Sequence, residues 1–244
     1  MPKPARLFAV INFEIRGEVL KRMSRLSESL QLGIILAISG GFMDAYTYVI
    51  RGQVFANAQT GNILLFGVNL SEGNFKAAVL YLYPVLAFSF GVAMAEIVRR
   101  RYSGMEKIHW MQITILIEAL MLFAVGFLPQ SLNILANCLV SFACGIQVQS
   151  FRTIKGNVIA TTMCTGNLRT ATQYICKFFY DKDRALLKMG IMYYGIIVIF
   201  IVGAILGYKC VQLWHESAIM VSGALMMIGF GMLFFEKKTV GKAT

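Results

Sequence analysis

The sequence predicts an all-α fold, a polytopic bundle of six transmembrane helices. Two observations lead to this prediction. Of the 244 residues, 57% are hydrophobic and only 14% are charged, and the mean hydropathy is +0.66. Soluble domains carry about 25% charged residues, so this chain lacks the side chains for a surface that faces water on all sides. The apolar residues also gather into segments of about 20 residues, the length that crosses the hydrocarbon of a bilayer.

Six apolar segments are long enough to be spans. They are Leu32–Ile50, Ala77–Val98, Trp110–Leu128, Leu132–Phe151, Leu186–Tyr208 and Ser217–Phe235. Two further segments, Phe55–Leu70 and Val158–Phe179, are interrupted by polar side chains, and the second also contains Arg169. The question for the fold is whether these two polar segments cross the membrane as well.

The positions of the basic residues decide this question, because Lys and Arg near the ends of spans accumulate in the cytoplasm. With six spans and a cytoplasmic N-terminus, 19 basic residues lie inside and three outside, whereas eight spans give 14 against 8. We therefore expect six spans in the inner (cytoplasmic) membrane, a transmembrane domain at residues 32–236, and cytoplasmic segments at residues 1–31 and 237–244. The two polar segments then become re-entrant or broken helices, buried in protein or lining a cavity.

The N-terminal stretch Met1–Gln31 mixes apolar and basic residues without an uninterrupted apolar h-region, so we identify no secretory signal in it. Two interpretations stay open. Either this stretch is an amphipathic segment on the cytoplasmic leaflet, or translation starts at Met23.

The net charge and the cysteines exclude several classes of partner. In a soluble protein, a formal charge of +11 would suggest nucleic acid. Here Lys and Arg lie between apolar segments, so we expect a lipid bilayer and no nucleic acid. The five cysteines form neither a CxxC motif nor a Cys/His ligand spacing, so we expect no structural disulfide, no metal site and no cofactor.

The two halves of the chain, residues 32–129 and 132–236, share an ordered series of matches. Gly41-Phe42-Met43 parallels Gly145-Ile146-Gln147, Ile50–Val54 parallels Ile154–Val158, and Thr60-Gly61-Asn62 parallels Thr165-Gly166-Asn167. Each half contributes three spans, an odd number, so the second half must be inverted relative to the first. Such an inverted 3+3 repeat is common in secondary transporters, whose discontinuous helices meet near the midplane of the membrane.

The chain contains the motif Ser39-Gly40-Gly41-Phe42-Met43-Asp44-Ala45-Tyr46, the motif Phe55-Ala56-Asn57-Ala58-Gln59-Thr60-Gly61-Asn62 and the second triplet Thr165-Gly166-Asn167. Together these motifs resemble the YoaK-type family of bacterial multi-pass membrane proteins, a domain of unknown function. The similarity runs from Gln31 to the C-terminus. It implies a membrane protein with six spans, and it assigns neither an activity nor catalytic residues.

Three ionisable residues are candidates for a substrate or ion pathway, because a charge in the hydrocarbon costs at least about 2.5 kcal/mol and usually faces a partner or water. Asp44 either contacts a cation, a proton or an ammonium group, or bonds neighbouring backbone. Glu118 is either a proton relay or a glutamic acid hydrogen-bonded between helices. Arg169 either holds an anion, pairs with Asp44 or Glu118, or lies at the cytoplasmic mouth. For Glu96 we expect an interfacial ion pair with the cluster Arg99–Arg101.

The polar segments supply the other candidates. Their glycines permit unusual backbone angles or close helix approach, and their Thr and Asn side chains either bond the backbone of a broken helix or face a solute. These candidates are Asn57, Gln59, Thr60, Gly61, Asn62, Thr165, Gly166 and Asn167, together with Gln147 near the repeat counterpart of Asp44.

These features predict a small-solute transporter or channel. The alternative is a non-transporting scaffold or sensor in an envelope complex. An intramembrane enzyme acting on lipid is disfavoured, because no span carries a DxxxD pair and both His residues lie at segment ends. The substrate, the coupling ion, the direction of transport and the oligomeric state stay open.

Overall fold

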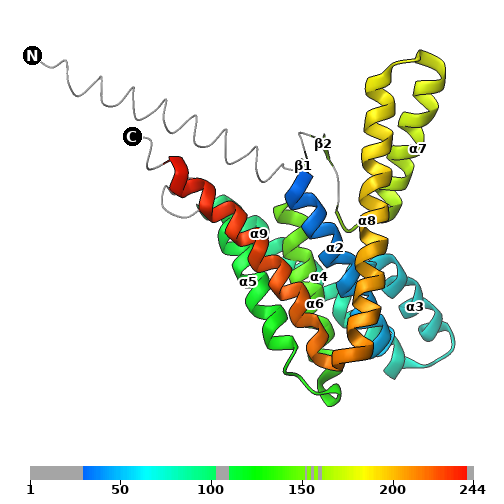
Figure 1. The fold of residues 1–244 in the computed structure, drawn as a ribbon. Helices are drawn as coiled ribbons and strands as arrows, with labels where there is room; N and C mark the ends of the chain where they lie inside the picture. Colours follow the sequence, from blue (N-terminus) through cyan, green and yellow to red (C-terminus); the bar gives the residue numbers. More distant parts are fainter. Residues whose placement is uncertain (1–29, 103–109, 152, 155–156, 159–160, 241–244) are drawn as a thin grey trace, which may run out of the picture.

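The computed structural model describes residues 30–102, 110–151, 153–154, 157–158 and 161–240. This part of the chain consists of helices, short turns and one small strand pair (Figure 1). The strands β1 (Thr153–Ile154) and β2 (Asn157–Val158) have two residues each and pair antiparallel. The predicted all-helical class is thus confirmed, whereas both interpretations of the N-terminal stretch concern residues outside the described ones.

The helices follow one another with short connections. They are α2 (Leu30–Ile50), α3 (Gln59–Ser71), α4 (Phe75–Tyr102), α5 (Trp110–Val125), the 3₁₀ turn η1 (Gln130–Leu132), α6 (Asn133–Ser150), α7 (Cys164–Asp181), α8 (Arg184–Trp214), the 3₁₀ turn η2 (His215–Ala218) and α9 (Ile219–Val240).

Four helical stretches of the described chain are long and apolar enough to cross a membrane: Leu30–Ile50, Phe75–Arg101, Gln130–Ser150 and Arg184–Leu233. The fourth contains α8 and most of α9, and the chain reverses its direction between these two helices at η2 (Figure 1). As one straight helix it would be about 75 Å long, more than twice the hydrocarbon thickness. The apolar part of α5, Met111–Val125, is shorter.

Two inner helices, α2 and α6, organise the bundle. Helix α2 packs against α8 and α9, and α6 packs against α4 and α5. Helix α3 lies along α4, and α7 lies along α8. In Figure 1, α7 extends toward the end of the molecule where α2 begins, and α3 lies nearer the opposite end. The first four helices and the last four therefore use the same set of pairings.

Glycines bring α2 and α8 into backbone contact. A Cβ atom added to Gly41 would collide with the carbonyl oxygen of Phe200, and one added to Gly203 would collide with the carbonyl oxygen of Ile38. Each carbonyl thus belongs to the residue three positions before the glycine on the same helix. Contacts of this closeness require a small residue, as is common where membrane helices pack.

The crossing of α4 and α6 repeats this arrangement. A Cβ atom on Gly91 would meet the carbonyl oxygen of Phe142, and one on Gly145 would meet the carbonyl oxygen of Phe88. The spacing of three residues between carbonyl and glycine is again the same on both helices. Two helix crossings, far apart in sequence, are therefore fixed by the same contact.

Arg51 is buried at the end of α2, with only 1% of its surface exposed. It is one of the three basic residues that the six-span prediction assigns to the outside. Its guanidinium instead donates hydrogen bonds to the oxygens of Tyr46, Val125, Leu128, Pro129 and Asn133 over 2.8–3.3 Å. Three of these acceptors are backbone carbonyls at or just after the end of α5, where helical carbonyls lack partners and carry partial negative charge. Arg51 thereby ties the turn after α2 to the turn between α5 and α6.

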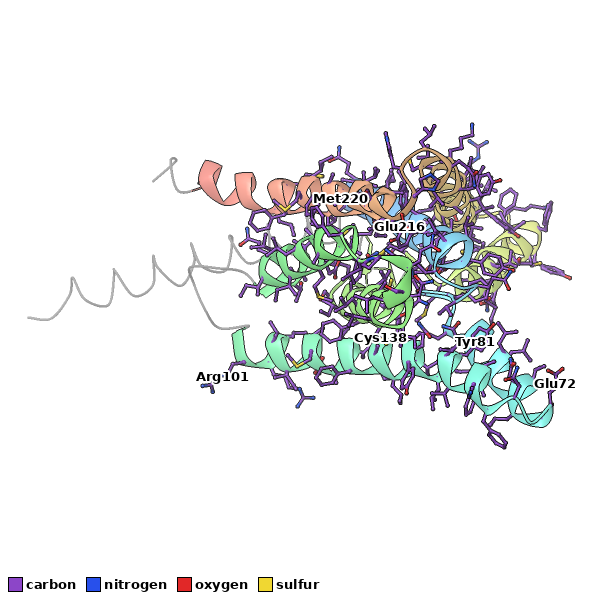
Figure 2. All side chains as sticks on the ribbon, turned by 90° about the horizontal axis from the view of Figure 1, so that it is seen from below. Glu72, Tyr81, Arg101, Cys138, Glu216 and Met220 are labelled. Carbon is purple, nitrogen blue, oxygen red and sulfur yellow. The ribbon has the colours of Figure 1, made fainter. Side chains whose placement is uncertain are left out.

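Helix α4 runs along one flank of the bundle, with Tyr81 near its start and Arg101 near its end (Figure 2). Close to that end, the carboxylate of Glu96 lies 2.7 Å from Arg99 and 2.8 Å from Arg100. Gln149 of α6 also donates to it, over 2.7 Å. The predicted ion pair is confirmed.

We expect Gly203→Ala to lower the free energy of unfolding by about 1–3 kcal/mol, because the added methyl group would push α8 away from α2. The matched control is Gly195→Ala on the same helix, where an added Cβ meets nothing within 4 Å. Its effect should stay within about 1 kcal/mol. Denaturant unfolding of the purified protein in detergent measures both. Equal effects of the two substitutions would contradict the assigned crossing.

Candidate functional site

The starts of α3 and α7 line one cavity of about 550 Å³. The residues between Ile50 and α3 are not helical, and neither are the described residues between Ser150 and α7. In the first of these segments, Gly52 adopts a φ of 89°, which allows the chain to turn sharply after α2. The lining comprises Asp44 from α2, Asn57, Ala58, Gln59 and Thr60 from the start of α3, Thr162 through Asn167 and Thr170 from the start of α7, and the rings of Phe88 and Phe200.

On one side of the cavity, Asp44 bonds the backbone in front of α3. Its carboxylate accepts a hydrogen bond from the backbone N–H of Asn57 over 2.6 Å. The side chain of Asn57 donates in turn to the carbonyl of Gly40 over 3.2 Å. The N-cap residue of α3, Ala58, offers no side-chain bond of its own, and the first turn of α3 contains no acidic residue. Asp44 therefore supplies the negative charge that the positive end of this helix dipole favours.

Asn62 holds the segment before α3 in place. The side chain of Asn62 is fully buried. It donates to the carbonyl of Phe55 over 2.7 Å and accepts from the N–H of Phe55 over 3.0 Å, and it also bonds Gln59. Gly61 lies under the ring of Phe55, where a Cβ atom would stand 2.8 Å from the ring. In the first Thr-Gly-Asn triplet, Gly61 and Asn62 thus brace the chain and do not line the cavity.

On the other side of the cavity, the start of α7 has no such carboxylate. Its N-cap residue, Met163, makes no side-chain cap bond, and its first turn has no acidic residue. A Cβ atom on Gly166 would meet nothing within 4 Å, so the backbone there faces open space. Thr162 is only 4% exposed, yet its hydroxyl has no hydrogen-bond partner. The two ends of the cavity are therefore chemically different.

The structure brings most, but not all, of the predicted site residues to this cavity. Seven of them line it: Asp44, Asn57, Gln59, Thr60, Thr165, Gly166 and Asn167. The cavity is also lined by residues that were not among the candidates predicted from the sequence, including Thr162, Cys164, Phe88 and Phe200. One signal for Thr162 was available. With the two Thr-Gly-Asn triplets aligned, Thr162 falls on Asn57.

The remaining candidates lie elsewhere. Glu118 is buried on α5 and one of its carboxyl oxygens has no partner. Gln147 is buried and donates to the carbonyl of Leu36 over 3.1 Å. Arg169 lies exposed on α7, and within the described chain it makes no ion pair with Asp44 or Glu118. Gln147 thus serves helix packing, and Arg169 is not among the cavity-lining residues.

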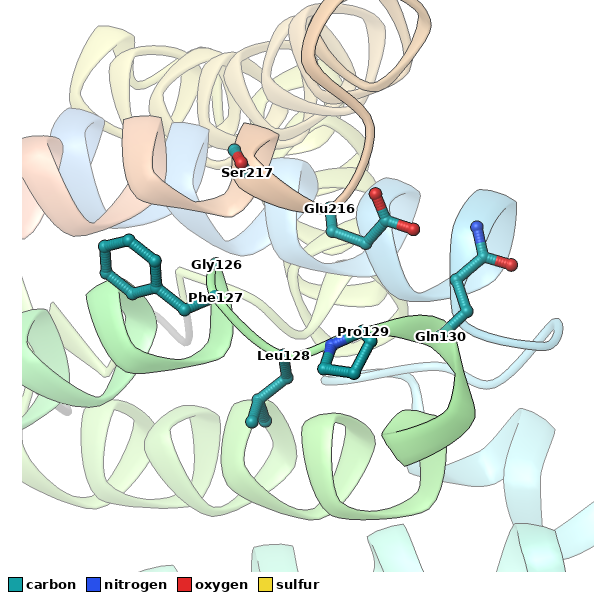
Figure 3. A pocket seen from close by; sticks show the side chains of 7 residues that line it. All are labelled: Gly126, Phe127, Leu128, Pro129, Gln130, Glu216 and Ser217. Carbon is teal, nitrogen blue, oxygen red and sulfur yellow. The ribbon is translucent and has the colours of Figure 1, made fainter.

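A second hollow lies where the turn between α5 and α6 meets the turn between α8 and α9. Its volume is about 420 Å³, and it is lined by Gly126, Phe127, Leu128, Pro129, Gln130, Glu216 and Ser217 (Figure 3). Glu216 is the single ionisable side chain in this lining. Because polar groups at the starts of both α3 and α7 converge on the first cavity instead, that cavity is the candidate site. Among the described residues, no group of three or more His, Cys, Asp or Glu residues is arranged to hold a metal ion.

Comparison with known proteins places the chain among membrane proteins. Residues 32–232 match the family described as protein of unknown function DUF1275. The chain is also 24% identical, over 181 residues, to the UPF0700 transmembrane protein YoaK of Bacillus subtilis (strain 168), an alignment that covers 70% of this chain and 79% of that protein. No solved structure matches.

We expect Asn62→Ala to lower the free energy of unfolding, because the backbone N–H and carbonyl of Phe55 would lose their partner. Each of these groups that stays unbonded should cost about 1–3 kcal/mol. The matched control is Asn69→Ala on the same helix, which removes a single local bond to the carbonyl of Leu65. This control should change stability by less than about 1 kcal/mol. Thermal unfolding in detergent compares the two variants. If Asn62→Ala unfolded at the same temperature as Asn69→Ala, the bracing role of Asn62 would be wrong.

Proposed function

The chain belongs to the DUF1275 family, and from this premise we propose that it is a six-span carrier that moves a small solute through the cavity between α3 and α7. That it is an integral membrane protein follows from the transmembrane relative and from the four membrane-length helical stretches. The orientation, the repeat and the transport role are parts of the proposal.

Helix lengths and polarity support six spans. In this proposal, α2, α4, α5, α6, α8 and α9 cross the membrane. With 13 residues, α3 is about 20 Å long, short of the roughly 30 Å hydrocarbon. Helix α7 is not among the membrane-length apolar stretches. With six spans, the distribution of Lys and Arg supports an inner-membrane protein whose two termini lie in the cytoplasm.

The helix contacts support an inverted repeat. Exchanging the two halves converts the pairing of α2 with α8 into that of α6 with α4, and the pairing of α3 with α4 into that of α7 with α8. The same exchange converts the contact of Gly41 with Phe200 into that of Gly145 with Phe88. In this arrangement α3 and α7 are half-helices on opposite sides of the membrane, and both start near its midplane.

The cavity itself is the observation that carries the transport proposal. Both polar segments line it, so groups from the two halves converge on one space of a size typical of small-molecule sites. Broken helices whose ends meet at the midplane are the usual binding sites of inverted-repeat transporters. A scaffold without transport would be expected to have a closed bundle at this position.

Cys164, the first residue of α7, lines the cavity and provides the test. In a variant that keeps only this cysteine, we expect a small, membrane-impermeant methanethiosulfonate to label it from each side of the membrane in turn, because alternating access opens the cavity to both faces. The matched control keeps only Cys144, which is fully buried on α6 and does not line the cavity. Mass spectrometry of labelled proteoliposomes measures both rates.

The rate at Cys164 should exceed that at Cys144 by about tenfold or more, because access controls thiol labelling. Labelling of Cys164 as slow as that of Cys144 would favour the closed scaffold. Labelling from one face alone would contradict alternating access.

A further inference from the structure

Two helix N-termini face the same cavity, and both attract negative charge. The first N–H groups of a helix have no partner within the helix, and the helix dipole adds a partial positive charge there. Such an end binds carboxylates and oxyanions without further basic residues. The first residues of both α3 and α7 line the cavity.

At the N-terminus of α3, the protein itself supplies the negative charge. The carboxylate of Asp44 bonds the backbone N–H of Asn57 over 2.6 Å, at the start of the segment that leads into the helix. The position is therefore occupied by a built-in anion. Asp44 is thus an example of a carboxylate bound next to a helix N-terminus in this cavity.

At the N-terminus of α7, no carboxylate of the described residues takes the corresponding place. When Gly41 is aligned with Gly145, Asp44 falls on Val148, an apolar residue. The N-cap residue, Met163, makes no side-chain cap bond, and the backbone at Gly166 faces open space. A second and independent observation points to a ligand here. Thr162 lines the cavity, and its hydroxyl is buried without a hydrogen-bond partner, the residue being only 4% exposed.

We infer that the cavity binds a small monovalent oxyanion, such as a carboxylate, at the N-terminus of α7. This inference rests on the proposed function and names the class of its solute. The first N–H groups of α7 and the hydroxyl of Thr162 provide the hydrogen-bond donors. Arg169 is not part of the cavity lining, so the helix end supplies the positive charge. Because Asp44 faces the same space, repulsion disfavours a ligand of higher negative charge.

The test measures protection of Cys164 in the purified full-length chain that keeps this single cysteine. The reagent is the uncharged methyl methanethiosulfonate, and the competing probes are acetate and acetamide, which share a shape and differ in charge. Acetate at ten times its dissociation constant should slow labelling about tenfold, because the unbound fraction falls by that factor. Acetamide at the same concentration should leave the rate unchanged, and sodium acetate and choline acetate should act equally.

A chain that keeps only Cys176 is the matched control. Cys176 lies exposed on the same helix, away from the cavity, so acetate should not change its rate. Equal protection of Cys164 by acetate and acetamide, or protection by neither, would overturn the anion inference and leave the transport proposal standing. An unreactive Cys164 beside a reactive Cys176 would overturn both.

A second variant checks the location. Val148→Asp offers α7 the carboxylate that α3 already has, so acetate should no longer protect Cys164. Val148→Asn, of similar size and uncharged, should retain the protection. Persisting protection in a folded Val148→Asp protein would place the anion elsewhere and contradict the assignment to α7. If Val148→Asp does not fold, the comparison of acetate with acetamide decides the question by itself.

Discussion

The structure depends on one constraint: backbone that leaves the helical path inside a membrane must find its hydrogen bonds within the protein. Three polar side chains meet this constraint in the proposed arrangement, two at the segment before α3 and one at the end of α5. Asp44 accepts from the N–H of Asn57, Asn62 bonds both the N–H and the carbonyl of Phe55, and Arg51 bonds the carbonyls that end α5. Without these partners, each unbonded backbone group would cost several kcal/mol in hydrocarbon. The polar motif is thus first a structural device, and its position allows α3 to start next to the cavity.

Glycine contacts determine where α3 and α7 start. Because Gly41 and Gly203 let α2 and α8 touch through backbone atoms, the turn after α2 and the start of α7 are drawn to the same region of the bundle. Gly91 and Gly145 do the same for α4 and α6. Close packing of two helix pairs therefore produces the cavity, although no glycine of these crossings lines it.

Two helix N-termini line the cavity, and they differ in whether a carboxylate of the protein lies beside them. The start of α3 already has a carboxylate, whereas α7 presents backbone donors and the unpaired hydroxyl of Thr162. In the inferred arrangement, a small anion binds at the start of α7, whereas Asp44 already occupies the corresponding place at α3. This asymmetry connects the proposed repeat to a proposed chemistry, because the two halves share a backbone arrangement and differ at Asp44 and Val148.

The sequence by itself determined the membrane class, the helical fold and seven of the residues that line the cavity, because hydrophobic segment length and repeated polar motifs are local properties of the chain. Only the tertiary structure decided what each polar side chain does. Asn62 bonds the segment before its own helix, Arg51 is buried and bonds the carbonyls at the end of α5, and Arg169 lies exposed on α7. These outcomes depend on partners that are distant in sequence, such as Asn133, which lies 82 residues after Arg51. Local pattern can place a polar residue in a span, but the partner that satisfies it is chosen by how the helices pack.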